Sequence, residues 1–271
     1  MWVAAVQLNS TVDMAANVAR ARGFIEAAAR HGAQLVAMPE HFACLGAEAA
    51  IQAAAQSLDG PLVTEFRSLA ATWGIFLLLG SFPELPATGP PPYNTSVLIG
   101  PDGAILAAYR KMHLFDIDLP GKPPYRESHF TRPGDGPAAA PLPGTPWVAG
   151  LSICYDLRFP ELFRALTDQG ANLLMTPAAF TATTGRDHWE VLLRARAVEN
   201  QAYVIAPAQW GQHAPGRNSY GRALIIDPWG LILAQAPDGE GLIFAELAPA
   251  RLAEVRRNMP CLKHRRIGVS Y

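Results

Sequence analysis

The feature of this sequence that most constrains its fold is the alternation of short apolar runs with longer amphipathic stretches. Each apolar run is bounded by Gly, Pro, Asn or Asp, which is typical of strands that end in tight turns. The predicted strands are Val3–Leu8, Gln34–Ala37, Ile75–Leu79, Thr95–Ile99, Ile105–Tyr109, Trp147–Ile153, Asn172–Thr176, Ala202–Pro207, Ala223–Asp227, Leu231–Ala234 and Leu242–Glu246. The predicted helices are Met14–His31, Pro61–Trp73, Pro160–Gln169, His188–Asn200 and Pro249–Arg256. This alternation predicts an α/β fold in which helices cover the faces of sheets.

Two short turns indicate that the sheets are mixed rather than purely parallel. Pro101–Gly103 and Pro228–Gly230 each separate two consecutive predicted strands, as in a hairpin. The proline-rich segments are predicted loops, and they are Pro83–Pro92, Gly121–Pro124 and Gly134–Pro146. None of these segments is long or polar enough to be a linker, so residues 1–271 are predicted to form a single domain.

Composition excludes several classes of protein. Lys and Arg total 22 against 23 Asp and Glu, so the net charge is −1, and nucleic acid is not an expected partner. Hydrophobic residues make up 50% of the chain and charged residues 17%, which is incompatible with intrinsic disorder. The N-terminus lacks the basic region of a signal peptide, and no apolar run approaches the roughly 20 residues of a membrane span. We therefore expect a cytoplasmic protein that makes no membrane contact.

The cysteines exclude two further kinds of protein. Cys44, Cys154 and Cys261 are far apart, and they form neither a CxxC pair nor a Cys/His cluster with zinc spacing. Their odd number argues against a disulfide scaffold and fits a reducing compartment. Glu40, His41 and Cys44 are close in sequence, but one short segment supplies neither a fourth ligand nor supporting residues for a metal. No metal is therefore expected, and Cys44 and Cys261 are interpreted as packing residues.

Three predicted strands are followed by a reactive side chain. Glu40 follows the strand Gln34–Ala37 through Met38-Pro39, and Lys111 follows the strand Ile105–Tyr109. Cys154 lies where the strand Trp147–Ile153 runs into the start of a helix. In open α/β sheets, ligands gather outside the carboxyl ends of strands. These junctions are therefore the places where a site is expected.

Cys154 is a candidate nucleophile because a helix start offers free N–H groups and the positive end of a dipole, which favour thiolate over thiol. Glu40 is a candidate base for the thiol, and Lys111 can stabilise the thiolate and the oxyanion of an acyl-transfer intermediate. The backbone N–H of Tyr155 is a second candidate oxyanion donor. The alternative for an isolated cysteine is a buried core residue, and for Glu40 and Lys111 it is a solvated charge at a strand end.

The residues around these three junctions resemble one family. MPEHF, YRKMHLFD and GLSICYDLRFPEL are similar to the Glu-Lys-Cys signature of the nitrilase, or carbon–nitrogen hydrolase, superfamily, in the same order. The resemblance extends from AAVQLNS near the start to RRNMPCLKHRR near the end. Further stretches, PGKPPYRES, TGRDHWEVLLRARAVENQAYVIAPAQWG and RNSYGRALIIDPWG, resemble the Nit1-type branch, whose members act as deaminated glutathione amidases.

This resemblance implies a four-layer α-β-β-α sandwich with mixed sheets that forms a homodimer or a higher homo-oligomer. It implies that Glu40 is the general base, Lys111 the oxyanion-stabilising cation or proton donor, and Cys154 the nucleophile. Glu127, in YRESHF, matches a second glutamate that supports the lysine and the substrate. The implied reaction hydrolyses the amide bond of a small anionic substrate through a cysteine thioester and needs no cofactor. For deaminated glutathione, the products are 2-oxoglutarate and cysteinylglycine.

Three alternatives to this function stay open. The omega-amidase branch shares FDIDxPGK, CYDxRF and HWExLxRARAV, and it acts on 2-oxoglutaramate or 2-oxosuccinamate. A serine hydrolase could use Ser152, which alternation places on the same side of the strand as Cys154, although the segment has no GxSxG elbow. A catalytically silent interaction scaffold is the third alternative, but it would have no use for Glu40, Lys111, Glu127 and Cys154 together.

Three further residues are candidates for substrate binding. Arg158, four residues after Cys154, carries a fork of donors suited to a substrate carboxylate, and its alternative is a salt bridge with Asp156 or Glu161. Thr184 and His188 follow the strand Asn172–Thr176 and are predicted to line the rim of the pocket. The alternative for His188 is an ordinary position in the first turn of a helix, and His41 and His113 are interpreted as ordinary residues.

Overall fold

The structure, a computed structural model, describes residues 1–118 and 124–267. The α-helices are α1 (Met14–Arg30), α2 (Glu48–Ala53), α3 (Pro61–Trp73), α4 (Pro160–Asp168), α5 (Ala182–Asn200) and α6 (Pro249–Asn258). Short 3-10 helices span Glu127–His129, Cys154–Arg158 and Cys261–His264. The strands are β1 (Trp2–Leu8), β2 (Leu35–Ala37), β3 (Phe76–Leu78), β4 (Phe82–Glu84), β5 (Tyr93–Ile99), β6 (Ile105–Arg110), β7 (Asp116–Ile117), β8 (Tyr125–Arg126), β9 (Ala138–Pro141), β10 (Val148–Leu151), β11 (Leu173–Met175), β12 (Tyr203–Ala206), β13 (Ala208–Ala214), β14 (Arg217–Tyr220), β15 (Leu224–Ile226), β16 (Ile232–Gln235) and β17 (Gly241–Glu246).

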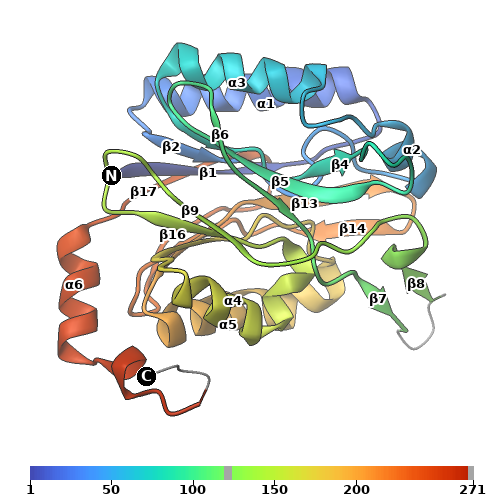
Figure 1. Ribbon diagram of the computed structural model, residues 1–271. Helices are drawn as coiled ribbons and strands as arrows, with labels where there is room; N and C mark the ends of the chain where they lie inside the picture. Colours follow the sequence, from blue (N-terminus) through green and yellow to red (C-terminus); the bar gives the residue numbers. More distant parts are fainter. Residues whose placement is uncertain (119–123, 268–271) are drawn as a thin grey trace.

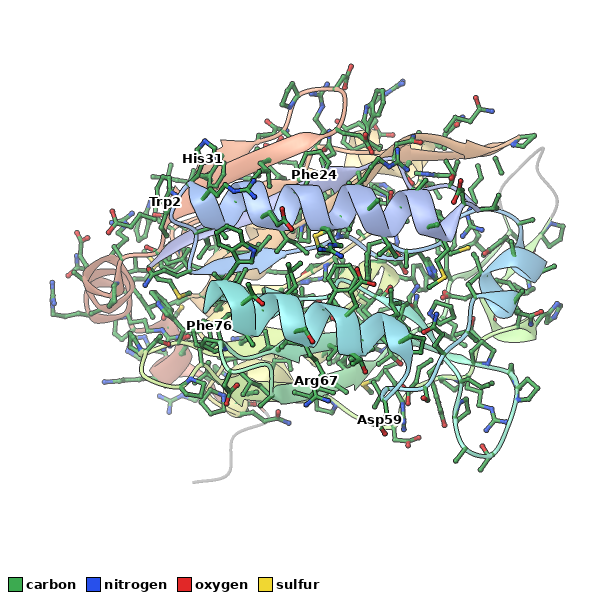
Figure 2. All side chains as sticks on the ribbon, turned by 90° about the horizontal axis from the view of Figure 1, so that it is seen from above. Trp2, Phe24, His31, Asp59, Arg67 and Phe76 are labelled. Carbon is green, nitrogen blue, oxygen red and sulfur yellow. The ribbon has the colours of Figure 1, made fainter. Side chains whose placement is uncertain are left out.

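Two stacked sheets form the middle of the molecule, and helices cover the outer face of each sheet (Figure 1). A nine-stranded sheet contains the path β14-β13-β1-β2-β3-β5-β4, with β17 paired to β1 and β6 paired to β5. Helices α1 and α3 lie side by side over this sheet (Figure 2). A six-stranded sheet has the order β16-β15-β12-β11-β10-β9, and α4 and α5 lie beneath it. The four-layer α-β-β-α sandwich expected from the sequence is therefore confirmed.

Both sheets mix parallel and antiparallel pairs, as the hairpin turns predicted. Strand β1 pairs in parallel with β2 and β13 and antiparallel with β17. In the second sheet, β10, β11 and β12 run parallel, whereas β9 and β15 pair antiparallel at either side of them. The parallel strands bring their carboxyl ends to a common edge, where loops from both sheets can meet.

Alternation along the central strands explains why they are apolar at almost every position, with Gln7 of β1 as an exception. In β1, Val3 and Ala5 belong to the core between the two sheets, whereas Ala4, Val6 and Leu8 belong to the core beneath α1 and α3. All five side chains are almost fully buried. A strand that is covered on both faces has no polar side, so its sequence is continuously hydrophobic.

Several predicted boundaries are wrong. Helix α5 begins at Ala182 rather than at His188. The segment Pro83–Pro92, predicted as loop, contributes Pro83 and Glu84 to β4, and Gly134–Pro146 contains β9. Most of the loop predicted at Gly121–Pro124 lies outside the described residues. The sequence did not predict α2, β7, β8, β13 or β14, because these elements are short, polar or rich in Gly and Pro.

Within residues 1–118 and 124–267, no helix combines the length and the apolar character needed to cross a membrane.

Candidate active site

Cys154 lies in a sharp turn between β10 and the 3-10 helix Cys154–Arg158. Its φ of 48° is left-handed, which costs a non-glycine residue about 1–3 kcal/mol. The Cys154 N–H donates to the carbonyl of Pro177 at 2.9 Å, which ties the turn to the segment after β11. The side chain contributes to the lining of a pocket although only 9% of the residue is exposed. The turn therefore aims the sulfur into a nearly closed site at the carboxyl end of β10.

Asp156, which the sequence analysis did not single out as part of the site, stabilises this turn through hydrogen bonds. Its buried carboxylate accepts hydrogen bonds from Ile153 N at 2.8 Å and from the Tyr109 hydroxyl at 2.8 Å. It also accepts from the His113 N–H at 3.1 Å, and the His113 ring Nδ1 lies 2.7 Å away. Asp156 thus fastens the turn of Cys154 to the end of β6 and the residues that follow it.

The N–H of Tyr155 is available to a ligand. Tyr155 lines the pocket, and its backbone N–H donates no recorded hydrogen bond to the described residues. Because the next N–H, that of Asp156, already bonds to the carbonyl of Ile153 at 3.0 Å, Tyr155 supplies the free donor beside the sulfur. The N–H of the predicted oxyanion donor therefore lies next to Cys154 in the chain, and Tyr155 lines the same pocket.

Glu40 follows β2, and contacts to both its backbone loop and its carboxylate fix its position. Gly80 approaches the carbonyls of Met38 and Pro39 so closely that a Cβ there would lie 2.0 Å from the Pro39 oxygen. The Glu40 carboxylate accepts from Asn94 Nδ2 at 2.9 Å and from the N–H of Ala179 at 2.8 Å. It is therefore oriented by groups from both sheets, because Asn94 belongs to β5 and Ala179 follows β11.

Lys111 joins the two glutamates. Its Nζ lies 3.1 Å from Glu40 Oε1 and 2.9 Å from Glu127 Oε2, and all three side chains are almost fully buried. Glu127 also accepts from the N–H of Phe115 at 2.6 Å. The three predicted charged residues and Cys154, which are far apart in the sequence, therefore line a single pocket.

The charges of this cluster hold one another in place. Burial alone would raise the pKa of Glu40, but the ammonium of Lys111, with smaller effects from His41, the Cys154 thiol and the Ala179 N–H, lowers it to about 2. Burial opposes the charge of Lys111, but Glu127 and Glu40 raise its pKa well above its usual value. The cluster at rest therefore contains two carboxylates and one ammonium.

One electrostatic expectation is wrong. The sequence analysis expected the helix start and Lys111 to favour the Cys154 thiolate. Instead, burial and then the charge of Glu40 raise the pKa of Cys154 well above its usual value, and Lys111 only partly opposes this effect. The reason is that Lys111 is already neutralised by two carboxylates, so the thiol faces a net negative charge. Cys154 at rest is a neutral thiol.

The pocket has a volume of about 1080 Å³, which is ample for a small peptide-like substrate. Its walls carry a group of large apolar or aromatic side chains, namely Phe115, Ile117, Tyr125, Phe130, Tyr155 and Phe180. Among the described residues, the charged side chains that line it are Glu40, Glu48, Lys111, Glu127 and Arg217. An apolar cavity with a few convergent polar groups is the usual form of a small-molecule site.

The three weaker candidates are placed differently from one another. Thr184 lines the pocket, with its hydroxyl 2.7 Å from that of Thr181. Arg158 and His188 are not among the described residues that line it; Arg158 Nη1 lies 3.2 Å from His188 Nδ1, and its guanidinium lies 5.2 Å from the ring of Phe180. The alternative salt bridge of Arg158 with Asp156 or Glu161 does not occur among the described residues.

Ser152 is not placed as a nucleophile. Its hydroxyl, which is fully buried, lies 3.0 Å from both the carbonyl of Met175 and the hydroxyl of Thr176. It is not among the described residues that line the pocket. The alternation that placed Ser152 and Cys154 on the same side fails because the strand ends at Leu151.

His41 and His113 were interpreted as ordinary, but His41 lines the pocket and His113 contacts Asp156 beside it. His41 lines the pocket, and burial lowers its pKa to about 4, so the ring is neutral at physiological pH. Carboxylate oxygens of Glu40 and Glu127 and a ring nitrogen of His41 lie within 4.8 Å of one another, as in a cation site. The Lys111 ammonium, however, already bonds to both carboxylates, so this set of residues does not fit a metal. The interpretation of Cys261 as a packing residue is wrong, because this cysteine is exposed.

Comparison with known proteins agrees with this fold. Residues 2–257 match the family model of the carbon-nitrogen hydrolases, and the chain belongs to this family. Its members hydrolyse carbon–nitrogen bonds, as the family name states, and this chain is a carbon–nitrogen hydrolase.

Relatives narrow the position of the chain within the family. The chain is 46% identical over 264 residues to a deaminated glutathione amidase of Synechocystis sp., an alignment that covers 97% of each protein. It is 38% identical to an omega-amidase of Homo sapiens, with 97% of this chain and 94% of the relative covered. The crystal structure of Nit3 of Saccharomyces cerevisiae, a member of branch 10 of the nitrilase superfamily, superposes with a TM-score of 0.88 at 34% identity and covers 98% of this chain and 97% of that one.

Proposed function

We propose that this protein hydrolyses deaminated glutathione to 2-oxoglutarate and cysteinylglycine through a thioester on Cys154. The observation that carries the proposal is the lysine held between two buried glutamates, which line a large, mostly apolar pocket together with a cysteine. The deaminated glutathione amidase at 46% identity, against 38% for the omega-amidase, supports this substrate over an omega-amide.

In the first step, the Cys154 sulfur attacks the amide carbonyl while its proton passes to the carboxylate of Glu40. The electron pair of the carbonyl moves to its oxygen, where the Lys111 ammonium and the free Tyr155 N–H stabilise the charge. Glu40 then gives the proton to the amide nitrogen, the carbon–nitrogen bond breaks, and the amine departs. The acyl group remains on Cys154 as a thioester.

In the second step, a water attacks the thioester carbonyl and gives a proton to Glu40. The oxyanion forms again beside Lys111 and the Tyr155 N–H, and the carbon–sulfur bond breaks as the intermediate collapses. The sulfur recovers its proton from Glu40, which returns the cluster to its resting state. The net reaction consumes one water and releases a carboxylic acid and an amine.

The resting protonation states require the first proton transfer and the attack to occur together. Because the pKa of Glu40 is about 2 and that of Cys154 is well above its usual value, transfer of the proton alone is unfavourable. When the sulfur attacks, the negative charge moves on to the carbonyl oxygen near Lys111 instead of remaining on sulfur. Bound substrate is therefore needed to make Cys154 nucleophilic.

The test is a comparison of kcat/KM for deaminated glutathione and 2-oxoglutaramate, with release of 2-oxoglutarate as the readout. We expect a clear preference for deaminated glutathione and no hydrolysis by Cys154→Ala. A preference for 2-oxoglutaramate would move the protein to the omega-amidases. Full activity of Cys154→Ala would exclude the cysteine mechanism altogether.

We further propose that the protein is a cytoplasmic homodimer. Support for a dimer comes from exposed apolar side chains on and beside α5, which are Val191, Val198, Trp229, Leu231 and Leu233. Light scattering at micromolar concentration should give twice the chain mass of 29.1 kDa, and Val198→Glu should shift the mass towards one chain. Fractionation of cells should recover the protein with the cytoplasmic enzymes, and its recovery in a membrane or secreted fraction would refute that location.

A further inference from the structure

A second cation, Arg217, lines the pocket, and unlike Lys111 it forms no ion pair with a carboxylate of the described residues. Arg217, the first residue of β14, forms no ion pair within the described part of the chain, and its Nη1 donates to the carbonyl of Gly46 at 2.5 Å. Glu48, at the exposed start of α2, also lines the pocket but lies beyond ion-pair distance of Arg217. Arg217 therefore brings a positive charge that no described residue neutralises.

The hairpin of β13 and β14 holds Arg217 in a fixed place. His213 on β13 lies 2.8 Å from the carbonyl of Ser10 through Nδ1 and 2.9 Å from the Ser219 hydroxyl through Nε2. Because a carbonyl only accepts, Nδ1 carries the proton and Nε2 accepts from Ser219. Burial lowers the pKa of His213 to about 4, so this ring is neutral and does not compete for an anion.

The hairpin belongs to the wall of the pocket that carries Glu40. Gly46, which Arg217 contacts, lies on the same loop as Glu40, after β2. The segment after β11 is bridged to the hairpin at Ala178–Ala208 and at Thr181–Ser219, and within it the Ala179 N–H holds the Glu40 carboxylate. In the proposed reaction, Glu40 gives its proton to the departing nitrogen. Arg217 therefore lies on the same wall of the pocket as the group that gives its proton to the departing amine.

We propose that Arg217 binds the terminal carboxylate of the departing amine, which is the glycine carboxylate of cysteinylglycine. This inference rests on the proposed function and assigns one end of its substrate. Two extended residues span about 7 Å, and a pocket of about 1080 Å³ has room for them beside the acyl half. A guanidinium can bind a carboxylate with two parallel hydrogen bonds, which gives direction as well as charge. Substrates that release ammonia have no carboxylate for this contact.

The test compares kcat/KM for two proteins, each with two substrates, as in a double-mutant cycle. The proteins are the wild type and Arg217→Gln; the substrates are deaminated glutathione and its analogue with a carboxamide in place of the terminal carboxylate. We expect Arg217→Gln to lower kcat/KM for deaminated glutathione about 10- to 100-fold, mainly through KM, because a charge-assisted hydrogen bond made equally in ground and transition states is lost. The wild type should lose a similar factor on the carboxamide, whereas Arg217→Gln should barely distinguish the two substrates.

Two further variants separate binding from folding. Arg217→Lys keeps the charge without the fork and should recover part of the discrimination. Arg67→Gln is a matched control, because Arg67 Nε donates to the carbonyl of Gly103 at 2.7 Å on the outer helix α3, away from the pocket (Figure 2). Its kinetic constants should stay within about threefold of the wild type.

The outcomes distinguish this inference from the proposed function. If the wild type hydrolyses deaminated glutathione and Arg217→Gln still prefers the carboxylate as strongly, the site for the terminal carboxylate is refuted and the function stands. If the wild type hydrolyses neither substrate, the proposed function fails and the inference fails with it.

Discussion

The substitution Glu40→Gln is expected to remove the charge of the proposed base while keeping its shape. The carboxylate accepts from Asn94 Nδ2 at 2.9 Å, Lys111 Nζ at 3.1 Å and Ala179 N at 2.8 Å. A glutamine has a single acceptor oxygen, so its best orientation serves Asn94 and Lys111 and leaves the Ala179 N–H unpaired. One buried donor without a partner costs about 1–3 kcal/mol, so the variant should fold with a melting temperature lowered by about 2–4 °C per kcal/mol.

The substitution should make the Cys154 thiol more acidic but the reaction slower. After burial, the negative charge of Glu40 is the largest cause of the raised pKa of Cys154, so the thiol of the variant should ionise at lower pH. Loss of the proton acceptor should nevertheless lower kcat/KM by about 10²- to 10⁴-fold, the usual contribution of a general base. A more ionised thiol with slower turnover would show that proton transfer, rather than thiolate population, limits the wild type.

The assay follows thiolate absorbance against pH and amide hydrolysis in the same preparations, with Cys154→Ala subtracted to remove the other thiols. Asp227→Asn is the matched control, because its buried carboxylate also accepts three hydrogen bonds, from Trp229 N at 2.9 Å, Leu231 N at 2.8 Å and Arg251 Nε at 3.0 Å. It should lose stability but keep its turnover. A Glu40→Gln protein with turnover within tenfold of the wild type, or with a thiol that ionises at higher pH, would refute the reasoning.

Three further predictions concern the same cluster and its surroundings. Lys111→Met should lower the free energy of unfolding by about 3–5 kcal/mol, because two buried carboxylates lose their shared cation, and adding Glu127→Gln should restore part of it; urea denaturation that shows no recovery would contradict the shared role. Cys154→Ala should abolish the acyl-enzyme seen by mass spectrometry, whereas Ser152→Ala should keep kcat within about threefold, and acylation of Cys154→Ala would argue for another nucleophile. The pKa of His213 is lowered to about 4 in the folded state from 6.5 when unfolded. Because the unfolded chain then binds more protons below pH 6.5, the free energy of unfolding should decrease as the pH is lowered. The loss attributable to this residue at pH 5 is about 2 kcal/mol, so the urea midpoint of His213→Gln should fall less between pH 7 and pH 5 than that of the wild type.

The reactive residues could be predicted from the sequence because each lies just beyond a recognisable strand. Glu40 follows β2, Lys111 follows β6 and Cys154 follows β10, and the carboxyl ends of such strands collect functional groups. What the sequence could not reveal is how completely they are buried together. The raised pKa of the Cys154 thiol results from that burial and from a carboxylate more than a hundred positions away in the chain.

The missed elements depend on contacts between distant residues. Helix α5 begins with Ala-Thr-Thr-Gly-Arg-Asp, and its Gly185 is a poor helix former. A Cβ at Gly185 would lie 2.4 Å from the Tyr220 side chain, so the glycine is required for the helix to pack against β14. Arg217 was overlooked for a similar reason. Its hairpin is polar, and only the fold shows that this hairpin forms a wall of the pocket.

The charges of the pocket suggest why the cysteine is kept neutral. A thiolate at rest would react with any electrophile that entered, whereas a thiol deprotonated only during attack reacts when a carbonyl lies beside Lys111 and the Tyr155 N–H. The cost is that the cluster of Glu40, Lys111 and Glu127 carries a net negative charge, which repels an anionic substrate. A second cation in the pocket offsets that repulsion. Arg217 meets this requirement because it lines the pocket and forms no ion pair among the described residues.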